Sequence, residues 1–197
     1  PTSMEFRILL CGDRGVGKTT FVQKLRDRTI LKKHVPSEYP VETTIPYLFN
    51  IGEVIFHFTE VGSPDEVKDL KKYDFVLAMC SADGRVSAYS ADRFMRHVFD
   101  QGIPSVLIVN KMDLKVKDFK VPPLQTIEMS IRNSKASEEP ILLIIRHYYG
   151  SRVRSVAMTD EYRIKHFVES ELATLHEEER QIQEKIQRYR ALQQVPK

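Results

Sequence analysis

The stretch Gly12-Asp13-Arg14-Gly15-Val16-Gly17-Lys18-Thr19 lies between an apolar run, Phe6 to Cys11, and a helix-like run that begins at Thr19. It fits the pattern G-x-x-x-x-G-K-[ST], in which glycines let consecutive backbone N–H groups point at phosphate oxygens. In such a loop Lys18 is expected to reach the β and γ phosphates, and the Thr19 hydroxyl to hold Mg²⁺. The sequence therefore predicts a phosphate-binding loop between a strand and a helix. The alternative is a glycine turn without a ligand.

Composition favours one globular domain with an appendage. The chain has 197 residues, 42% of them hydrophobic, which is enough for a core that is stable alone. The net charge is only +3 and basic residues are scattered among acids, so direct nucleic-acid binding is not expected. Cys11 and Cys80 each close an apolar run without metal-ligand spacing, which predicts buried thiols in a reducing compartment.

No membrane anchor is expected. No apolar stretch approaches the ~20 residues that span a bilayer, and no signal peptide is recognised. Met4 is not followed by glycine and no cysteine ends the chain, so both kinds of lipidation signal are missing. We expect a soluble intracellular protein, and interpret Pro1-Thr2-Ser3 as an added segment outside the fold.

Apolar runs of strand length alternate with helical periodicity over residues 5–150, which is typical of a parallel sheet with helices on both faces. Near-continuous apolar runs predict three buried central strands, Phe6 to Cys11, Phe75 to Cys80 and Val106 to Asn110. Helices are predicted over Thr19 to about Arg28, Ala88 to about Asp100, and Pro140 to Tyr149.

A hairpin is predicted between the first helix and the second central strand. Its strands are Ile45 to Phe49 and Glu53 to Phe58, around the turn Asn50-Ile51-Gly52. A third short strand-like segment covers Thr126 to Met129. Thr29 to Thr44 is then a long polar loop, and loops of this length in compact domains are usually functional.

A long helix is predicted from Asp160 to about Gln194. Its composition changes to Glu, Gln, Arg and Lys, and Glu179 interrupts a narrow apolar stripe. The stripe consists of Leu172, Leu175, Ile182, Ile186 and Tyr189. Two interpretations stay open: a solvated terminal helix packed on its own domain, or a helix that docks a partner or forms a coiled coil.

Asn110-Lys111-Met112-Asp113 directly follows the apolar run Val106 to Val109. A carboxylate at Asp113 can accept hydrogen bonds from N1–H and the exocyclic amine of guanine, whereas adenine would leave buried polar groups unpaired. Lys111 is expected to lay its stem along the base, and Asn110 to tie this loop to the phosphate loop. These residues predict specificity for guanine.

Together these motifs resemble the Ras superfamily of small GTPases over residues 5–150, and within it the Ran family, which acts in nuclear transport. The Ran-like stretches are Gly12 to Val22, Lys32-Lys33-His34-Val35, Gly84-Arg85-Val86-Ser87-Ala88-Tyr89, and Glu138 to Gly150 with Ser155-Val156-Ala157-Met158. The last is the most specific, because a C-terminal extension and helix without lipid-bearing cysteines is a Ran-family trait.

The resemblance implies a fold, a ligand and partners. The fold is a three-layer α/β/α G domain of the P-loop NTPase class over residues 4–158, with a mostly parallel six-stranded sheet, and a helical extension over residues 159–197. The ligands are GTP or GDP with Mg²⁺. The implied activity is a nucleotide-dependent switch in nucleocytoplasmic transport, in the nucleus and cytoplasm. Its implied partners are transport receptors, exchange factors and activating factors.

The resemblance also assigns nucleotide contacts outside the two motifs. Thr20 belongs to the phosphate loop, and Ser37 has the family spacing of the Mg²⁺-binding hydroxyl, whereas Thr44 lies too close to the third strand. The Gly62 amide is expected to contact the γ phosphate. Ser130-Ile131-Arg132 corresponds to the family's Ser-Ala-Lys loop, in which the amide of the second residue, Ile131, is expected to meet the guanine oxygen.

Three positions depart from the family pattern. Thr59 stands where the family has an aspartate that orients Mg²⁺, and Glu60 beside it is expected to point to the opposite strand face, which weakens the metal site. Ser63 replaces the water-orienting glutamine and is too short for that task. Arg14 adds bulk to the phosphate loop. No catalytic residue is therefore identified, and slow hydrolysis is expected.

Two other classes of function remain alternatives. A pseudo-GTPase would be an interaction module that binds nucleotide weakly or permanently and joins an assembly through its C-terminal helix. An ATP-dependent small-molecule kinase would rest on the phosphate loop alone, and Asn110-Lys111-Met112-Asp113 argues against it.

Overall fold

The computed structural model of the chain describes residues 4–27, 40–133, 138–156 and 160–193. The chain divides into two compact units, Pro1–Val156 and Ala157–Lys197. The first unit contains the sheet and the predicted nucleotide-binding motifs. The second contains one long helix.

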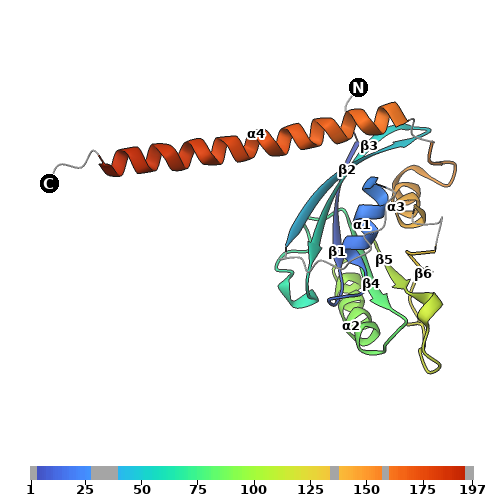
Figure 1. Cartoon of the computed structure of the whole chain (residues 1–197). Helices are drawn as coiled ribbons and strands as arrows, with labels where there is room; N and C mark the ends of the chain where they lie inside the picture. Colours follow the sequence, from blue (N-terminus) through green and yellow to red (C-terminus); the bar gives the residue numbers. More distant parts are fainter. Residues whose placement is uncertain (1–3, 28–39, 134–137, 157–159, 194–197) are drawn as a thin grey trace. The chain divides into compact units, whose positions relative to one another are not determined.

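Six strands form a single sheet in the order β2-β3-β1-β4-β5-β6 (Figure 1). Their bounds are β1 Met4–Cys11, β2 Val41–Phe49, β3 Gly52–Val61, β4 Phe75–Ser81, β5 Ser105–Asn110 and β6 Thr126–Glu128. Every neighbouring pair is parallel except β2 and β3, which are antiparallel. The predicted α/β class with a six-stranded, mostly parallel sheet is thereby confirmed.

Four α-helices accompany the strands. They are α1 Lys18–Asp27, α2 Val86–Asp100, α3 Glu139–Tyr149 and α4 Asp160–Gln193, and two short 3₁₀ turns are η1 Pro64–Glu66 and η2 Met112–Leu114. All four lie where the periodicity predicted helices, and their first residues differ from the prediction by two positions or fewer.

The helices of the first unit cover both faces of the sheet. From α1, Phe21 meets Phe58 of β3 edge to face, with ring centroids 6.3 Å apart. On the same face of the sheet, the ring centroid of Tyr148 in α3 lies 5.0 Å from that of Phe6 in β1. On the other face, α2 buries five side chains against β1, β4 and β5: Ala88, Ala91, Phe94, Met95 and Val98. The two-residue period of a strand therefore divides the central apolar runs between two cores.

The hairpin strands are longer than predicted. β2 begins at Val41, so the last four residues of the predicted loop Thr29 to Thr44 are strand, while residues 28–39 lie outside the described parts of the chain. Val41 pairs with Glu60, and Thr44 pairs with His57. Because one face of this ladder is open, polar side chains alternate along it, and backbone pairing rather than an apolar run defines the strand.

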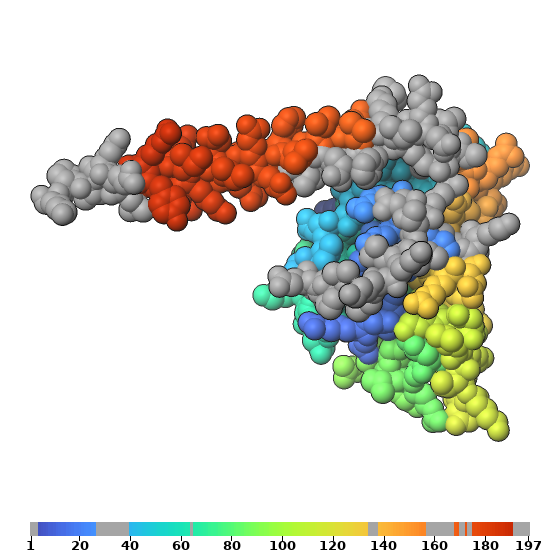
Figure 2. All heavy atoms as spheres, viewed as in Figure 1, coloured from blue at the N-terminus to red at the C-terminus, as the bar shows by residue number. Residues whose placement is uncertain are grey.

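Helix α4 has 34 residues. The apolar side chains described in its stripe are exposed, as are its charged neighbours, and Figure 2 shows the red half of this helix as a row of surface side chains. Among the residues that the structure describes, no helix has both the length and the apolar character needed to cross a membrane.

Candidate functional site

The predicted site residues follow the carboxyl ends of the parallel strands. Gly12 follows β1, Gly62 follows β3, Lys111 follows β5, and Met129-Ser130 follows β6. In a parallel sheet these ends meet at one edge, which is where open α/β sheets bind ligands. The topology therefore gathers residues that are distant in the sequence.

The predicted phosphate loop, Gly12 to Thr19, has no room for side chains at two of its glycines. A Cβ atom at Gly12 would lie 2.2 Å from the carbonyl oxygen of Met79, and one at Gly17 would lie 2.4 Å from Nδ2 of Asn110. Gly17 also has a φ of +111°, a conformation that favours glycine. The loop backbone is thus packed directly against β4 and β5.

Lys18 places a buried cation inside this loop. Its side chain is 2% exposed, and Nζ donates hydrogen bonds to the carbonyl oxygens of Gly12 at 2.7 Å and Asp13 at 3.0 Å. Burial lowers the pKa of Lys18, because removal from water disfavours the charged form. An anion that entered the loop would therefore meet a poorly hydrated ammonium group.

Thr19 and Glu60 place two oxygen atoms next to the loop. Thr19 Oγ1 donates a hydrogen bond to Oε2 of Glu60 at 2.8 Å, and Glu60 is 1% exposed. Burial raises the pKa of Glu60, while the bond from Thr19 and the charge of Lys18 act in the opposite direction. A hydroxyl beside a carboxylate is a fitting oxygen set for a hard cation such as Mg²⁺.

Glu60 and Thr59 point to opposite faces of β3, as predicted, but it is Glu60 and not Thr59 that lies on the face of the predicted phosphate loop, so the prediction that Glu60 is turned away from the site is wrong. Glu60 continues the buried alternation Val54, Phe56, Phe58 on the face of β3 that packs against α1, so it points toward Thr19. Thr59 lies on the other face. The physical cause is the strand period of two, and this alternation in the sequence could have revealed the correct face.

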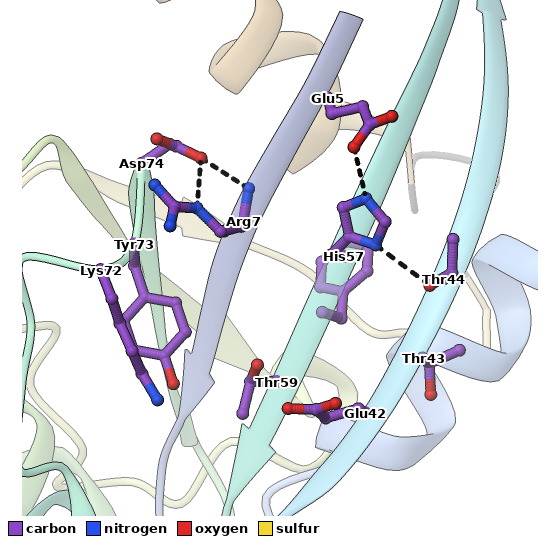
Figure 3. Close-up of a pocket in the computed structure, with 11 residues that line it drawn as sticks. Glu5, Arg7, Glu42, Thr43, Thr44, His57, Thr59, Lys72, Tyr73 and Asp74 are labelled. Atoms are coloured by element: carbon purple, nitrogen blue, oxygen red, sulfur yellow. Dashed lines mark hydrogen bonds and ion pairs between the residues drawn. The ribbon is translucent and has the colours of Figure 1, made fainter. Parts of the chain in front are cut away.

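Figure 3 shows the pocket on that other face, lined by Thr59 together with Glu42 and His57. His57 Nε2 lies 3.2 Å from Oε2 of Glu5, and its Nδ1 lies 3.1 Å from Oγ1 of Thr44. The side chains of His57 and Glu5 are 40% and 56% exposed to solvent. Thr59 is therefore separated from the phosphate loop by the sheet and cannot act beside Thr19.

Asn110 joins three loops. Its Nδ2 donates to the carbonyl oxygen of Val16 at 2.8 Å, and its Oδ1 accepts from the N–H of Ile131 at 3.0 Å. The side chain is 4% exposed. The predicted tie between Asn110 and the phosphate loop is confirmed. The Ile131 amide, predicted to meet a guanine oxygen, instead has Asn110 as its partner.

The Asp113 carboxylate lies at an exposed position of the same edge. Ser130 Oγ accepts a hydrogen bond from the backbone N–H of Asp113 at 2.9 Å, which fixes the loop.

Lys111 pairs with a second carboxylate at this edge. It has a left-handed φ of 59°, and its Nζ lies 2.7 Å from Oδ2 of Asp83. Although partial burial acts in the opposite direction, hydrogen bonds from Lys111 and Ser81 lower the pKa of Asp83. Sequence reasoning missed Asp83, which follows β4 at the same edge.

Glu66 binds the amide that was predicted to contact a γ phosphate. The N–H of Gly62 donates to Oε2 of Glu66 at 3.1 Å. Ser63 shapes the same turn: its Oγ accepts the N–H of Asp65 at 3.3 Å, and its carbonyl oxygen accepts that of Glu66 at 3.1 Å. No sequence pattern signalled this contact, because it depends on the rotamer of one exposed glutamate.

The remaining predicted residues have simpler surroundings. Arg14 is exposed, so its bulk does not fill the loop, and Arg132 is exposed as well. Thr20 is half-buried in the first turn of α1. Ser37 lies outside the described residues.

The edge of the sheet thus combines a tightly packed glycine loop, a buried lysine, a hydroxyl–carboxylate pair and a separate exposed carboxylate. It can hold a multiply charged anion at the loop, a hard cation beside it, and a heterocycle with hydrogen-bond donors at Asp113. No protein-family model matches the chain.

Glu60→Gln tests the buried carboxylate through pH. Because burial in the folded state raises the pKa of Glu60 above its ordinary value of 4.5, the folded state binds more protons than the unfolded state as pH rises past 4.5. As pH rises above 4.5, the free energy of unfolding of the wild-type protein therefore falls. That of the variant does not fall in this way, because it has no carboxyl group at position 60. The free energy of unfolding of Glu60→Gln minus that of the wild type should therefore increase from pH 4 to pH 7, measured by urea unfolding.

The control is Glu128→Gln, which removes an exposed carboxylate of β6. An equal increase in the control would contradict the prediction.

Proposed function

We propose that this chain binds a guanine nucleotide at the carboxyl edge of its sheet and acts as a nucleotide-dependent switch, with a G domain of the P-loop NTPase class like that of Ras-superfamily GTPases. One observation carries the proposal. Asn110 bonds to Val16 at 2.8 Å and to Ile131 at 3.0 Å, so the loops that two separate motifs assign to phosphate and to guanine share one buried amide.

Phosphate binding is assigned to the loop amides and Lys18. A diphosphate or triphosphate would replace the loop carbonyls that now accept from Lys18 Nζ at 2.7 and 3.0 Å, and would neutralise a cation that burial disfavours. Thr19 and Glu60 would hold Mg²⁺ with the phosphates. When bound, this ion supplies positive charge that neutralises phosphate oxygens.

Base recognition is assigned to Asp113. Its carboxylate can accept from two donors of guanine, while the N–H of its own backbone is already satisfied by Ser130. Adenine presents an acceptor where guanine presents N1–H, so it could not donate to this carboxylate, which in the structure accepts a hydrogen bond from Asn133 Nδ2 at 3.5 Å. The pair of Lys111 and Asp83 at 2.7 Å holds the intervening lysine over the same edge.

The Ran-like stretches extend the proposal to a cellular role. We assign the chain to nucleocytoplasmic transport, in the nucleus and the cytoplasm, with transport receptors, exchange factors and activating factors as partners. The physical basis of a switch is the ordering of loops by contacts to the γ phosphate. Among the residues that the structure describes, we assign this contact to the Gly62 amide.

Hydrolysis by this site is proposed to be slow. The Ser63 hydroxyl accepts from the Asp65 N–H at 3.3 Å and is too short to orient a water toward a phosphoryl group. No side chain is assigned a catalytic role.

Asp113→Asn should abolish guanine selectivity. Asparagine keeps one acceptor oxygen but turns an N–H group toward the second guanine donor. One charge-assisted hydrogen bond worth about 1.5–3 kcal/mol is then lost, so GDP affinity should fall at least about tenfold. Isothermal titration with GDP and ADP measures the effect. Asp118→Asn is the matched control, because it removes an exposed carboxylate that pairs with Arg85 at 2.8 Å. Wild-type protein that binds neither GDP nor GTP would overturn the proposal.

One observation favours a second candidate, the pseudo-GTPase. Glu66 Oε2 accepts a hydrogen bond at 3.1 Å from the Gly62 N–H, the group that we assign to a γ phosphate, so a bound triphosphate would have to displace this carboxylate. A module that holds GDP permanently, or nucleotide only weakly, would have this arrangement, and α4 would join it to an assembly.

Single-turnover conversion of bound GTP separates the two candidates. A switch should form GDP at a rate below about 10⁻⁴ s⁻¹ alone, and an activating partner should accelerate it. A pseudo-GTPase should form none under either condition. Quenched samples analysed by chromatography give the rate directly.

Glu66→Gln should shift the preference between nucleotides toward the triphosphate. A γ phosphate and the Glu66 carboxylate repel each other and compete for one N–H, so the variant should raise the ratio of GTP-analogue to GDP affinity on the order of tenfold. Competition titrations with a non-hydrolysable analogue measure this ratio. Asp65→Asn removes the same charge from the same turn without touching Gly62. An unchanged ratio in Glu66→Gln, or an equal change in Asp65→Asn, would refute the competition.

A further inference from the structure

Helix α4 carries an apolar seam that nucleotide binding does not use. Its members alternate in spacing between four and three residues, which is the period of a coiled coil, and they remain 37–70% exposed. They are Val168, Leu172, Leu175, Ile182, Ile186 and Tyr189, with Glu179 at the one polar position. Residues 168–190 cover about three heptads, the length at which such a pattern becomes meaningful.

The opposite face of the helix satisfies its charges internally. Arg180 lies 2.7 Å from Oε1 of Glu177 and 3.0 Å from Oε1 of Glu184, at positions outside the seam. Such pairs between residues three and four apart stabilise an exposed helix face. This face therefore suits water, and the seam is the face available for association.

We propose that α4 pairs with α4 of a second copy of this chain in an antiparallel coiled coil, in the register that places Leu175 opposite Ile186 of the second copy. In this register Leu172 faces Tyr189 and Glu179 faces Ile182 of the other chain. The paired segment covers residues 168–193, which is about 39 Å at 1.5 Å per residue.

Charge complementarity selects the antiparallel orientation. In a parallel dimer Glu179 would face Glu179 across the seam, and Lys185 would flank Arg190 of the other chain, so both contacts repel. In the antiparallel register Glu178 flanks Lys185 of the second copy, and Glu169 flanks Arg190. Two-fold symmetry repeats each attractive pair.

The same charges select the register. A shift of one heptad in one direction places Glu178 beside Glu178 of the second copy, and a shift in the other direction places Lys185 beside Lys185. Either shift also shortens the paired segment by seven residues. Only the proposed register keeps both flanking pairs attractive and uses the whole described seam.

Reversing the charge at Lys185 tests orientation, since the two orientations predict opposite effects. Lys185→Glu should weaken the antiparallel dimer about tenfold in Kd, by placing it beside Glu178, and the swap Glu178→Lys with Lys185→Glu should restore wild-type affinity. Sedimentation equilibrium of the full chain measures Kd. Arg188→Glu, which makes the same charge change off the seam, should leave it unchanged.

The other outcomes overturn the proposal. A tighter Lys185→Glu dimer indicates parallel helices, because the repulsion with Arg190 would be relieved. A wild-type chain that sediments as a monomer at 100 µM removes the pairing altogether. Nucleotide binding enters neither measurement, so the result is independent of the proposed function.

Disulfide trapping tests the register. The double variant Glu178→Cys with Lys185→Cys should form covalent dimers on oxidation. Glu178→Cys alone and Lys185→Cys alone should form none, because position 178 lies beside 178, and 185 beside 185, only in the registers shifted by one heptad. The native thiols do not interfere, because Cys11 and Cys80 are fully buried, and burial raises the pKa of each to about 12. Trapping of either single variant, or no trapping of the double variant, would contradict the proposed register.

Discussion

The buried amide of Asn110 is the constraint on which the candidate site depends. Its donor and its acceptor are both used, by Val16 at 2.8 Å and Ile131 at 3.0 Å. Leaving one partner of a buried hydrogen bond unsatisfied costs about 1–3 kcal/mol, so the spacing of the two loops is fixed by this side chain. Gly17 belongs to the same constraint, because a Cβ there would lie 2.4 Å from Asn110 Nδ2.

The central strands could be predicted because burial on both faces demands continuous apolar runs, which local sequence displays. The start of β2 could not, because Val41 is a strand residue only through its pairing with Glu60. Glu60 itself was predictable in principle. Motif alignment assigned the carboxylate position to Thr59, whereas the alternation of Phe56 and Phe58 already placed Glu60 on the inner face.

Contacts made by single rotamers were beyond sequence reasoning. The bonds from Gly62 to Glu66 and from Lys111 to Asp83 join residues that no motif relates. These contacts affect the electrostatic potential at this edge of the sheet in a way that the overall composition does not indicate. Acidic side chains surround a buried Lys18, so an incoming anion gains from the lysine and the loop amides but meets Glu60 and Glu66 nearby. A divalent cation at Thr19 and Glu60 would offset that repulsion, which links metal binding to anion binding.

The stability of helix α4 is a separate question that the candidate site does not explain. Isolated helices gain little from backbone hydrogen bonding alone, and most helical stability in proteins comes from burial of an apolar face. Ion pairs such as Arg180 with Glu177 add only about 0.2–0.5 kcal/mol each. The exposed seam from Val168 to Tyr189 therefore has to be covered for its apolar surface to contribute, and Glu179 restricts what can cover it. A second α4 in antiparallel orientation meets both conditions with residues already present in the chain.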